Sequence, residues 1–234
     1  MPSYECPRIT IPGHFFNVWN GSNYLSNFIE DQFYKEMSVS ELQQRYAENI
    51  EALVRLNNLA GKLYRSNPLN KTAVFMDISS EDVLNLLKSL NRYNVKYLLV
   101  GGMAGVVHGH IRTTQDMDLW IKKDRENAIA FVKALNENDV PGADLLLDMP
   151  LIFGWTSVRF GMSGFELDLG HSLKAFQESD FDSCYERSLT ADFEGVPFHV
   201  IHLKDLITEK KATARAKDLA DVEELQRIWE NQQS

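Results

Sequence analysis

A short apolar segment that ends at two glycines places the strongest constraint on the fold. Residues 96–100, Lys-Tyr-Leu-Leu-Val, are rich in strand formers, and Gly101-Gly102 follow them directly. Helical and strand patterns alternate around this strand, namely a helix over 80–91, a short helix over 103–109, a strand over 117–121 and a helix over 124–135. This order predicts a domain that mixes helices with strands and holds two glycines between a strand and a helix.

The later part of the chain adds a hairpin, a last strand and helical ends. Residues 157–160 and 165–169 have strand patterns, and the four-residue loop 161–164 between them suits a β-hairpin. Residues 196–201 form another strand candidate. The charged chain from Leu203 onward has a helical pattern.

The earlier part of the chain contains a long amphipathic helix, predicted from Ser38 to about Arg65. Ser38 and Glu41 form a capping-box pattern at its start. Its apolar residues recur at three- and four-residue steps, at Leu42, Tyr46, Ile50, Leu53 and Leu56.

A turn-rich stretch, residues 66–71, is the best candidate for a domain boundary, because it breaks the helical pattern and contains a proline. It divides the chain into a largely helical N-terminal extension over residues 1–70 and a main domain over residues 71–234. The extension shows no motif with a known role. We expect that a protein partner or a second copy of this chain could bind through it.

The composition is that of a folded protein without a field that attracts polyanions. Hydrophobic residues make up 44% and charged residues 24% of the chain. The formal net charge of -9 makes nucleic acid a poor default partner. Cys6 and Cys184 lie in no zinc-type cluster, and no segment has the pattern of a signal peptide or a membrane span. These features predict a cytoplasmic protein that does not bind a membrane.

Asp116 and Asp118 form the first candidate site. A single residue separates them on a predicted strand, and a strand alternates its side chains, so both carboxylates point to the same face. Two anionic groups this close repel each other unless a cation neutralises them. Mg²⁺ is the natural cation, with Mn²⁺ as the alternative, because both suit carboxylate ligands and Mg²⁺ is commonly bound together with substrate phosphates.

Residues on either side of this pair favour a phosphate ligand. Gly101-Gly102 leave their backbone N–H groups unobstructed between a strand and a helix, although a glycine pair can also just make a tight turn. Arg112, Thr113 and Thr114 precede the aspartates and supply a guanidinium and two hydroxyls that could contact phosphate oxygens. Together they predict that a nucleoside triphosphate (NTP) binds beside the metal.

A later strand repeats the acidic spacing at Glu166 and Asp168, and Asp168 is the candidate for the third metal ligand. Three carboxylates can hold two metal ions, one activating an acceptor hydroxyl and the other steadying the triphosphate. In-line attack on the α-phosphate then depends mainly on positioning and charge neutralisation. In this scheme Asp168 also accepts the proton of the hydroxyl.

These residues resemble a known family. The run from Gly101 to Gly109, Gly-Gly-Met-Ala-Gly-Val-Val-His-Gly, and the run from Arg112 to Asp118, Arg-Thr-Thr-Gln-Asp-Met-Asp, are similar to the minimal, polymerase-beta-like nucleotidyltransferase superfamily. The residues of these motifs look like those of its bacterial branch, which contains abortive-infection toxin-type and lincosamide-modifying members. The tail from Leu203 to Asp221 resembles that branch too, and the resemblance covers about residues 93–228.

The resemblance implies an α+β fold, with a small mixed β-sheet, helices packed on it and further helices at the C-terminus. It implies a metal on Asp116 and Asp118, a third carboxylate at Asp168, and NTP phosphates at Gly101-Gly102. It also places Lys217 and Asp218 near the site. In the commonest spelling of the superfamily a serine follows the first glycine, and Gly102 stands in its place.

Three functions fit the sequence. The leading one is a metal-dependent enzyme that transfers a nucleoside monophosphate from an NTP such as ATP to a hydroxyl of a small molecule, protein or RNA. The second is a weakly active or inactive protein of the same fold that acts as a toxin–antitoxin or other interaction partner through residues 1–70. The third treats Asp116-Met117-Asp118 as the metal motif of a nucleotide-sugar glycosyltransferase, which normally has a longer nucleotide-binding region before the motif.

Overall fold

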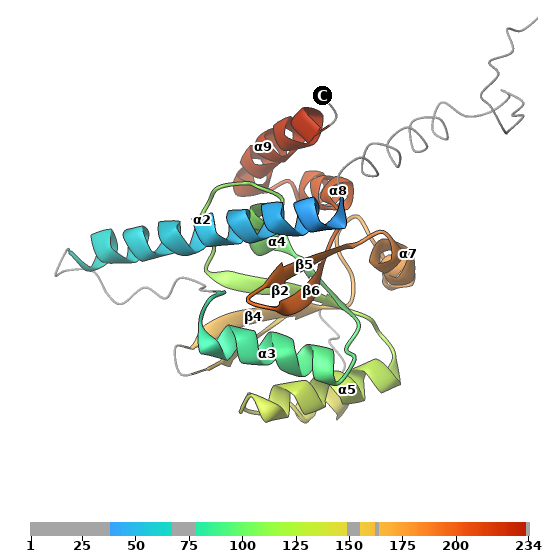
Figure 1. Ribbon diagram of the computed structural model, residues 1–234. Helices are drawn as coiled ribbons and strands as arrows, with labels where there is room; N and C mark the ends of the chain where they lie inside the picture. The colour runs from blue at the N-terminus through green and yellow to red at the C-terminus, as the bar shows by residue number, and fades with distance from the viewer. Residues whose placement is uncertain (1–37, 67–77, 149–154, 162–163, 233–234) are drawn as a thin grey trace, which may run out of the picture. The chain divides into compact units, whose positions relative to one another are not determined.

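Six strands form one mixed β-sheet in the computed structural model, which describes residues 38–66, 78–148, 155–161 and 164–232 (Figure 1). The strands are β1 (Tyr97–Val100), β2 (Asp116–Ile121), β3 (Thr156–Phe160), β4 (Phe165–Gly170), β5 (Leu189–Phe193) and β6 (Val196–Val200). Their order across the sheet is β3-β4-β2-β1-β6-β5. β2 pairs parallel with β4 and antiparallel with β1, so it lies inside the sheet with a neighbour on each side.

Helices cover both faces of this sheet. They are α2 (Val39–Arg65), α3 (Glu81–Arg92), α4 (Gly101–Val107), α5 (Arg125–Glu137), α6 (Leu145–Asp148), α7 (Phe181–Glu186), α8 (Leu203–Thr213) and α9 (Ala216–Gln232), with a 3-10 turn at Glu178–Asp180. α3 and α5 pack together on one side, and α2, α4 and α8 lie on the other (Figure 1). The α+β fold class expected from the sequence is confirmed.

Side-chain caps fix where two of the helices begin. The Ser80 hydroxyl accepts a hydrogen bond from the N–H of Val83 at 3.3 Å and caps α3. The Asp124 carboxylate accepts one from the N–H of Asn127 at 2.7 Å and caps α5. Both helices therefore begin where the sequence pattern predicts, directly after a polar capping residue.

The two faces of β2 have different environments. Met117 and Leu119 are fully buried in the core on one face. Asp116 and Asp118 lie on the other face, where Asp118 contacts the first residue of α4, Gly101. β2 thus presents Asp116 and Asp118 on the face opposite to Met117 and Leu119.

α2 packs on the side of the sheet that carries α4. Tyr46, Ile50 and Leu53 on α2 belong to the buried core. The Asn49 amide donates a hydrogen bond to the carbonyl of Val107, at the C-terminal end of α4, at 2.8 Å. The helix predicted over residues 38–65 is confirmed, and it braces the helix that begins at the two glycines.

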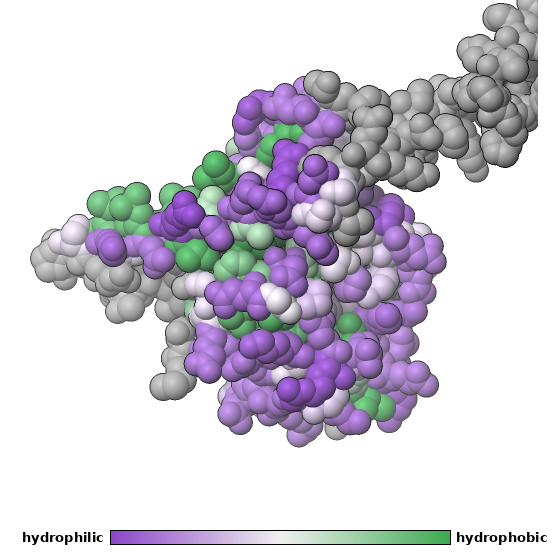
Figure 2. Space-filling model, in the orientation of Figure 1, coloured by the Kyte–Doolittle hydropathy of each residue, from purple (hydrophilic) through white to green (hydrophobic). Residues whose placement is uncertain are grey.

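The outer surface of α2 is partly hydrophobic. Hydrophobic atoms lie exposed along this helix in Figure 2, and Leu59 and Leu63 in its C-terminal half are more than half exposed. None of the helices that the structure describes is long and apolar enough to cross a membrane.

The predicted domain boundary falls in residues 67–77, which are outside the described part of the chain. The division into residues 1–70 and 71–234 stays a prediction, and so does a partner role for the N-terminal extension, since residues 1–37 also lie outside it. Residues 39–234 cluster as one compact unit, to which α2 contributes.

Most of the remaining predicted elements are present within a few residues of their expected bounds, including the β3–β4 hairpin, β6 and the C-terminal helices. β5, α6 and α7 were not predicted. β5 pairs antiparallel with β6 and forms one edge of the sheet.

Candidate functional site

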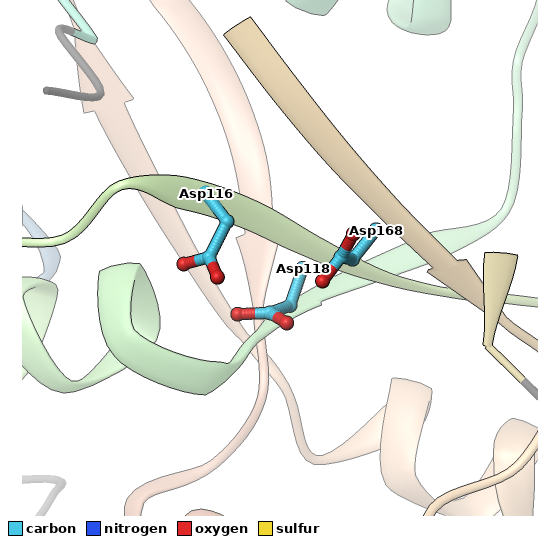
Figure 3. A group of neighbouring side chains, drawn as sticks. All are labelled: Asp116, Asp118 and Asp168. Carbon is cyan, nitrogen blue, oxygen red and sulfur yellow. The ribbon is translucent and has the colours of Figure 1, made fainter. Parts of the chain in front are cut away.

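Three aspartates converge at neighbouring strands. Asp118 on β2 lies directly beside Asp168 on the parallel strand β4, and Asp116 lies two residues earlier on β2. Each offers a carboxylate oxygen, and these oxygens lie within 4.8 Å of one another. Figure 3 shows the three carboxylates turned towards one another on the same side of the two strands. All three side chains are partly buried, so a small ligand can still reach them.

The electrostatics of Asp118 show that this cluster holds uncompensated negative charge. Burial and the negative charges of Asp116 and Asp168 together raise the pKa of Asp118 to about 7. A hydrogen bond from the N–H of Gly102 and the positive charge of Lys210 oppose this rise and do not cancel it. A divalent cation would neutralise the repulsion, and three carboxylate oxygens are the donor set that Mg²⁺ or Mn²⁺ takes.

Hydroxyl groups orient Asp116 and Asp168. The Thr114 hydroxyl donates to the Asp116 carboxylate at 3.0 Å. The Ser157 hydroxyl, on the adjacent edge strand β3, donates to the Asp168 carboxylate. Glu166 pairs instead with Arg159 at 2.9 Å on the exposed surface and is not part of the cluster.

The two glycines leave space that other site residues fill. Gly101 has a φ of +65°, and a Cβ there would lie 1.9 Å from Oδ2 of Asp118. A Cβ on Gly102 would lie 2.8 Å from the Thr114 hydroxyl oxygen and 3.6 Å from Nη2 of Arg112. Any larger residue at either position would therefore displace an aspartate or its hydrogen-bonding neighbour.

Arg112 is anchored beside this glycine turn. Its Nη1 donates to Oδ2 of Asp221 at 2.5 Å, and its Nε donates to the carbonyl of Thr113 at 3.2 Å. Thr113 thus contributes its backbone, whereas Thr114 contributes its hydroxyl. The structure brings Gly101, Gly102, Arg112 and Thr114 together around Asp116 and Asp118.

A buried charge network joins α8 and α9 next to the aspartates. Lys210 of α8 donates to Asp221 of α9 at 2.7 Å and lies 3.5 Å from Asp218. Arg215 pairs with Asp218 at 2.5 Å, and His110 contacts Asp221 at 2.9 Å. Burial alone would raise the pKa of Asp221, but the hydrogen bonds from Lys210 and His110 hold it below its usual value.

Two positively charged side chains of this network, Lys210 and Arg215, interact electrostatically with the aspartates. Its hydrogen bond to Asp218 raises the pKa of Arg215, and the charges of Asp118 and Asp116 add to the rise. Lys210 in turn lowers the pKa of Asp118. Lys217, which the sequence analysis places near the site, is exposed on α9, and its role stays a prediction.

The sequence contains a signal for this network that sequence reasoning did not use. Lys210 follows Leu203, Leu206 and Ile207 at helical steps, so it lies on the apolar face of α8. Asp218 and Asp221 lie on the same face as the buried residues Val222 and Leu225 of α9. Charged residues at such positions indicate buried ion pairs rather than a solvated helix surface.

Similarity to known proteins points to a nucleotidyltransferase family. A protein-family model described as a nucleotidyltransferase of unknown function (DUF6036) matches residues 74–230. No curated protein matches the chain. Among solved structures, an antigenic nucleotidyltransferase-like protein from Paracoccidioides brasiliensis is similar at 18% identity and a TM-score of 0.39, over 64% of this chain and 76% of that one. The abortive-infection and lincosamide-type branch stays a prediction.

Proposed function

Because this chain belongs to the family of nucleotidyltransferases of unknown function (DUF6036), we propose that it is a metal-dependent enzyme that transfers a nucleoside monophosphate from an NTP to a hydroxyl group. The observation that carries the proposal is the cluster of Asp116, Asp118 and Asp168, whose carboxylate oxygens lie within 4.8 Å of one another. A cluster of this kind is costly without a cation, and it lies beside the two glycines.

The three aspartates would hold the divalent cation, Mg²⁺ or Mn²⁺. When bound, the cation supplies charge neutralisation at the triphosphate and lowers the pKa of the acceptor hydroxyl. Ser157 and Thr114 keep Asp168 and Asp116 oriented for this role through their hydroxyl hydrogen bonds. Lys210 adds a fixed positive charge from the side of α8.

The triphosphate would lie at the glycine turn. Arg112 is held over Gly102 by Asp221, so its guanidinium needs little reorganisation to contact a phosphate. Because Gly101 and Gly102 lack side chains, Asp118 and Thr114 lie directly against the turn, which would bring the metal and the phosphates together. Asp168, on the strand away from this turn, would accept the proton of the attacking hydroxyl.

The test is NTP binding in the presence and absence of Mg²⁺, measured by calorimetry. We expect wild-type protein to bind an NTP only with the metal, and the double variant Asp116→Asn/Asp118→Asn to lose this binding by at least about tenfold while it stays folded. Asp182→Asn is the matched control, because Asp182 forms a solvent-exposed ion pair with Lys122 on another part of the surface.

Equal metal-dependent binding in the double variant and the wild type would refute the site. Binding without transfer of a labelled nucleoside monophosphate to any component of a cell extract would favour the interaction-partner function over the enzyme. The four common NTPs, tested separately, would identify the preferred base.

A further inference from the structure

One tryptophan lies on the aspartate face of the sheet with a large part of its ring exposed. Trp155 directly precedes β3 and is 38% exposed. Its indole fills the space that a side chain on Gly170 of β4 would take, because a Cβ there would lie 2.6 Å from Cε2 of the ring. Gly170 shares its strand face with Asp168, so the indole lies on the same face as the metal-binding aspartates.

The indole is fixed in place. One part of the ring packs on Gly170, and Nε1 donates a hydrogen bond to the carbonyl of Ser172 at 3.1 Å. A fixed and exposed aromatic ring loses little conformational entropy when a flat ligand stacks on it. By contrast, Trp120, on the same face of the sheet, is completely buried.

The position of Trp155 corresponds to the acceptor side of the site. The glycine turn lies next to Asp118 on the β1 side of β2, whereas Asp168 and Trp155 lie on the β4–β3 side. In phosphoryl transfer the attacking and leaving oxygens are roughly in line, on opposite sides of the phosphorus. A triphosphate at the glycine turn therefore leaves the β4–β3 side for the acceptor.

We propose that Trp155 is the stacking platform for the base of a ribonucleoside acceptor, whose ribose hydroxyl lies at Asp168. Trp155 lies one strand over and two residues along from Asp168, so strand geometry separates their Cα atoms by about 8 Å, a span comparable to that of one nucleoside. Ser157, two residues after Trp155 and therefore on the same face of β3, already donates its hydroxyl to Asp168. This favours face stacking over the many hydroxyl hydrogen bonds that a sugar acceptor requires.

The proposal rests on the transferase function and adds its substrate class. The ribose oxygen forms a bond to the α-phosphorus of the NTP, and the bond from that phosphorus to the β-phosphate oxygen breaks. Pyrophosphate leaves, and the hydroxyl proton passes to Asp168. The nucleoside is either free or the 3′ end of a single-stranded RNA, whose terminal base stacks in the same way.

The binding test uses the full chain with Mg²⁺ and a short single-stranded RNA that carries a fluorophore at its 5′ end. We expect Trp155→Ala to raise the dissociation constant about five- to hundredfold, and Trp155→Phe to retain most of the affinity. Trp229→Ala is the control for loss of a tryptophan, because Trp229 belongs to α9 and packs against His202 and Lys204.

A change in the ligand gives a second readout that does not depend on the folding of a variant. An RNA with an abasic 3′ terminus should bind the wild-type protein more weakly than the intact RNA does. The factor should equal the one by which Trp155→Ala weakens binding of the intact RNA. Competition by free nucleosides distinguishes the two sources, since strong competition indicates a free nucleoside and its absence indicates an RNA end.

The proposal is overturned if neither RNA nor nucleoside binds, or if Trp155→Ala and the abasic end both leave the affinity unchanged. Transfer to a sugar compound that depends on Trp155 while RNA binding does not would also overturn it. Failure of the transferase function has a different signature, because NTP binding would then not require Asp116 and Asp118, whatever the effect of Trp155.

Discussion

At the scale of single residues, Thr114 supplies a hydroxyl beside Gly102, the position that is a serine in the commonest form of the superfamily motif. The Thr114 hydroxyl oxygen lies 2.8 Å from the point where a side chain on Gly102 would begin, and it donates to Asp116. A hydroxyl is therefore present at this place although it comes from a different position in the chain. The departure from the commonest superfamily spelling at Gly102 need not remove a hydroxyl from the site.

Gly101→Ala tests the packing of the turn against Asp118. An alanine Cβ would collide with Oδ2 of Asp118, and the positive φ adds backbone strain. We expect Mg²⁺ to raise the melting temperature of the wild type but not that of Gly101→Ala, and we expect the variant to lose about 1–3 kcal/mol of stability. Differential scanning fluorimetry with and without Mg²⁺ measures the first effect, and urea unfolding measures the second.

Gly195→Ala is the matched control for that variant. Gly195 has a φ of +76°, but nothing lies within 4 Å of a Cβ placed there. It therefore reproduces the backbone strain without the collision. A Mg²⁺ response that survives in Gly101→Ala as fully as in Gly195→Ala would contradict the role given to the turn.

At the scale of elements, Asp221 on α9 holds two positively charged side chains near the site, Lys210 of α8 and Arg112. Asp221 accepts hydrogen bonds from Lys210 and Arg112, and the side chains of Lys210 and Asp221 are each only 7% exposed. The two helices and the loop before β2 thus meet at one carboxylate. Its loss would leave a buried lysine with Asp218 as its remaining partner.

Asp221→Asn is therefore expected to destabilise the protein by about 3–5 kcal/mol, because it breaks a buried ion pair and leaves part of the charge uncompensated. Urea unfolding followed by circular dichroism measures the change. Asp182→Asn, which removes an exposed partner of Lys122, should change the stability little. Similar effects of the two substitutions would argue against a structural role for the network.

Local patterns predicted most elements, because capping residues and apolar periodicity act within one helix or strand. β5 was missed because its turn signal is unusual. Glu194 and Gly195 both have positive φ, as in a two-residue type I′ hairpin, but glutamate is rare at such a position, where asparagine or aspartate is expected.

The candidate site was only partly predictable for a different reason. Asp116 and Asp118 share a face because side chains alternate along a single strand, which is a local property. Their approach to Asp168 requires β4 to lie beside β2 in parallel, which is a non-local pairing that spacing alone does not fix. Lys210 was not predicted as part of the site, although its apolar neighbours on α8 place it in the interior.

At the scale of the whole molecule, a buried histidine gives the stability a dependence on pH. Burial lowers the pKa of His108 from 6.5 to about 4, although its hydrogen bond to the carbonyl of Ile201 opposes the change. Between these two values the unfolded chain binds a proton that the folded protein does not. The free energy of unfolding therefore falls as the pH falls from 6.5 to 4.

One pKa unit corresponds to about 1.4 kcal/mol, so the loss that His108 causes is about 3 kcal/mol. His108→Gln can keep the donor to Ile201 without the titration. We expect its unfolding free energy to decline less steeply with acid than that of the wild type, as urea titrations at several pH values would show. Parallel curves for the two proteins would mean that His108 does not carry this dependence.

Two side chains on the aspartate face of the sheet occupy volume that a glycine leaves empty across a strand pair or turn. Asp118 fills the space beside Gly101, and Trp155 fills the space above Gly170. In each pair, the glycine can be replaced by a larger residue without a collision only if the other residue changes as well. We therefore expect each pair to be inherited together, so that related chains with a larger residue at position 101 also lack the aspartate, and those with a larger residue at position 170 lack the tryptophan.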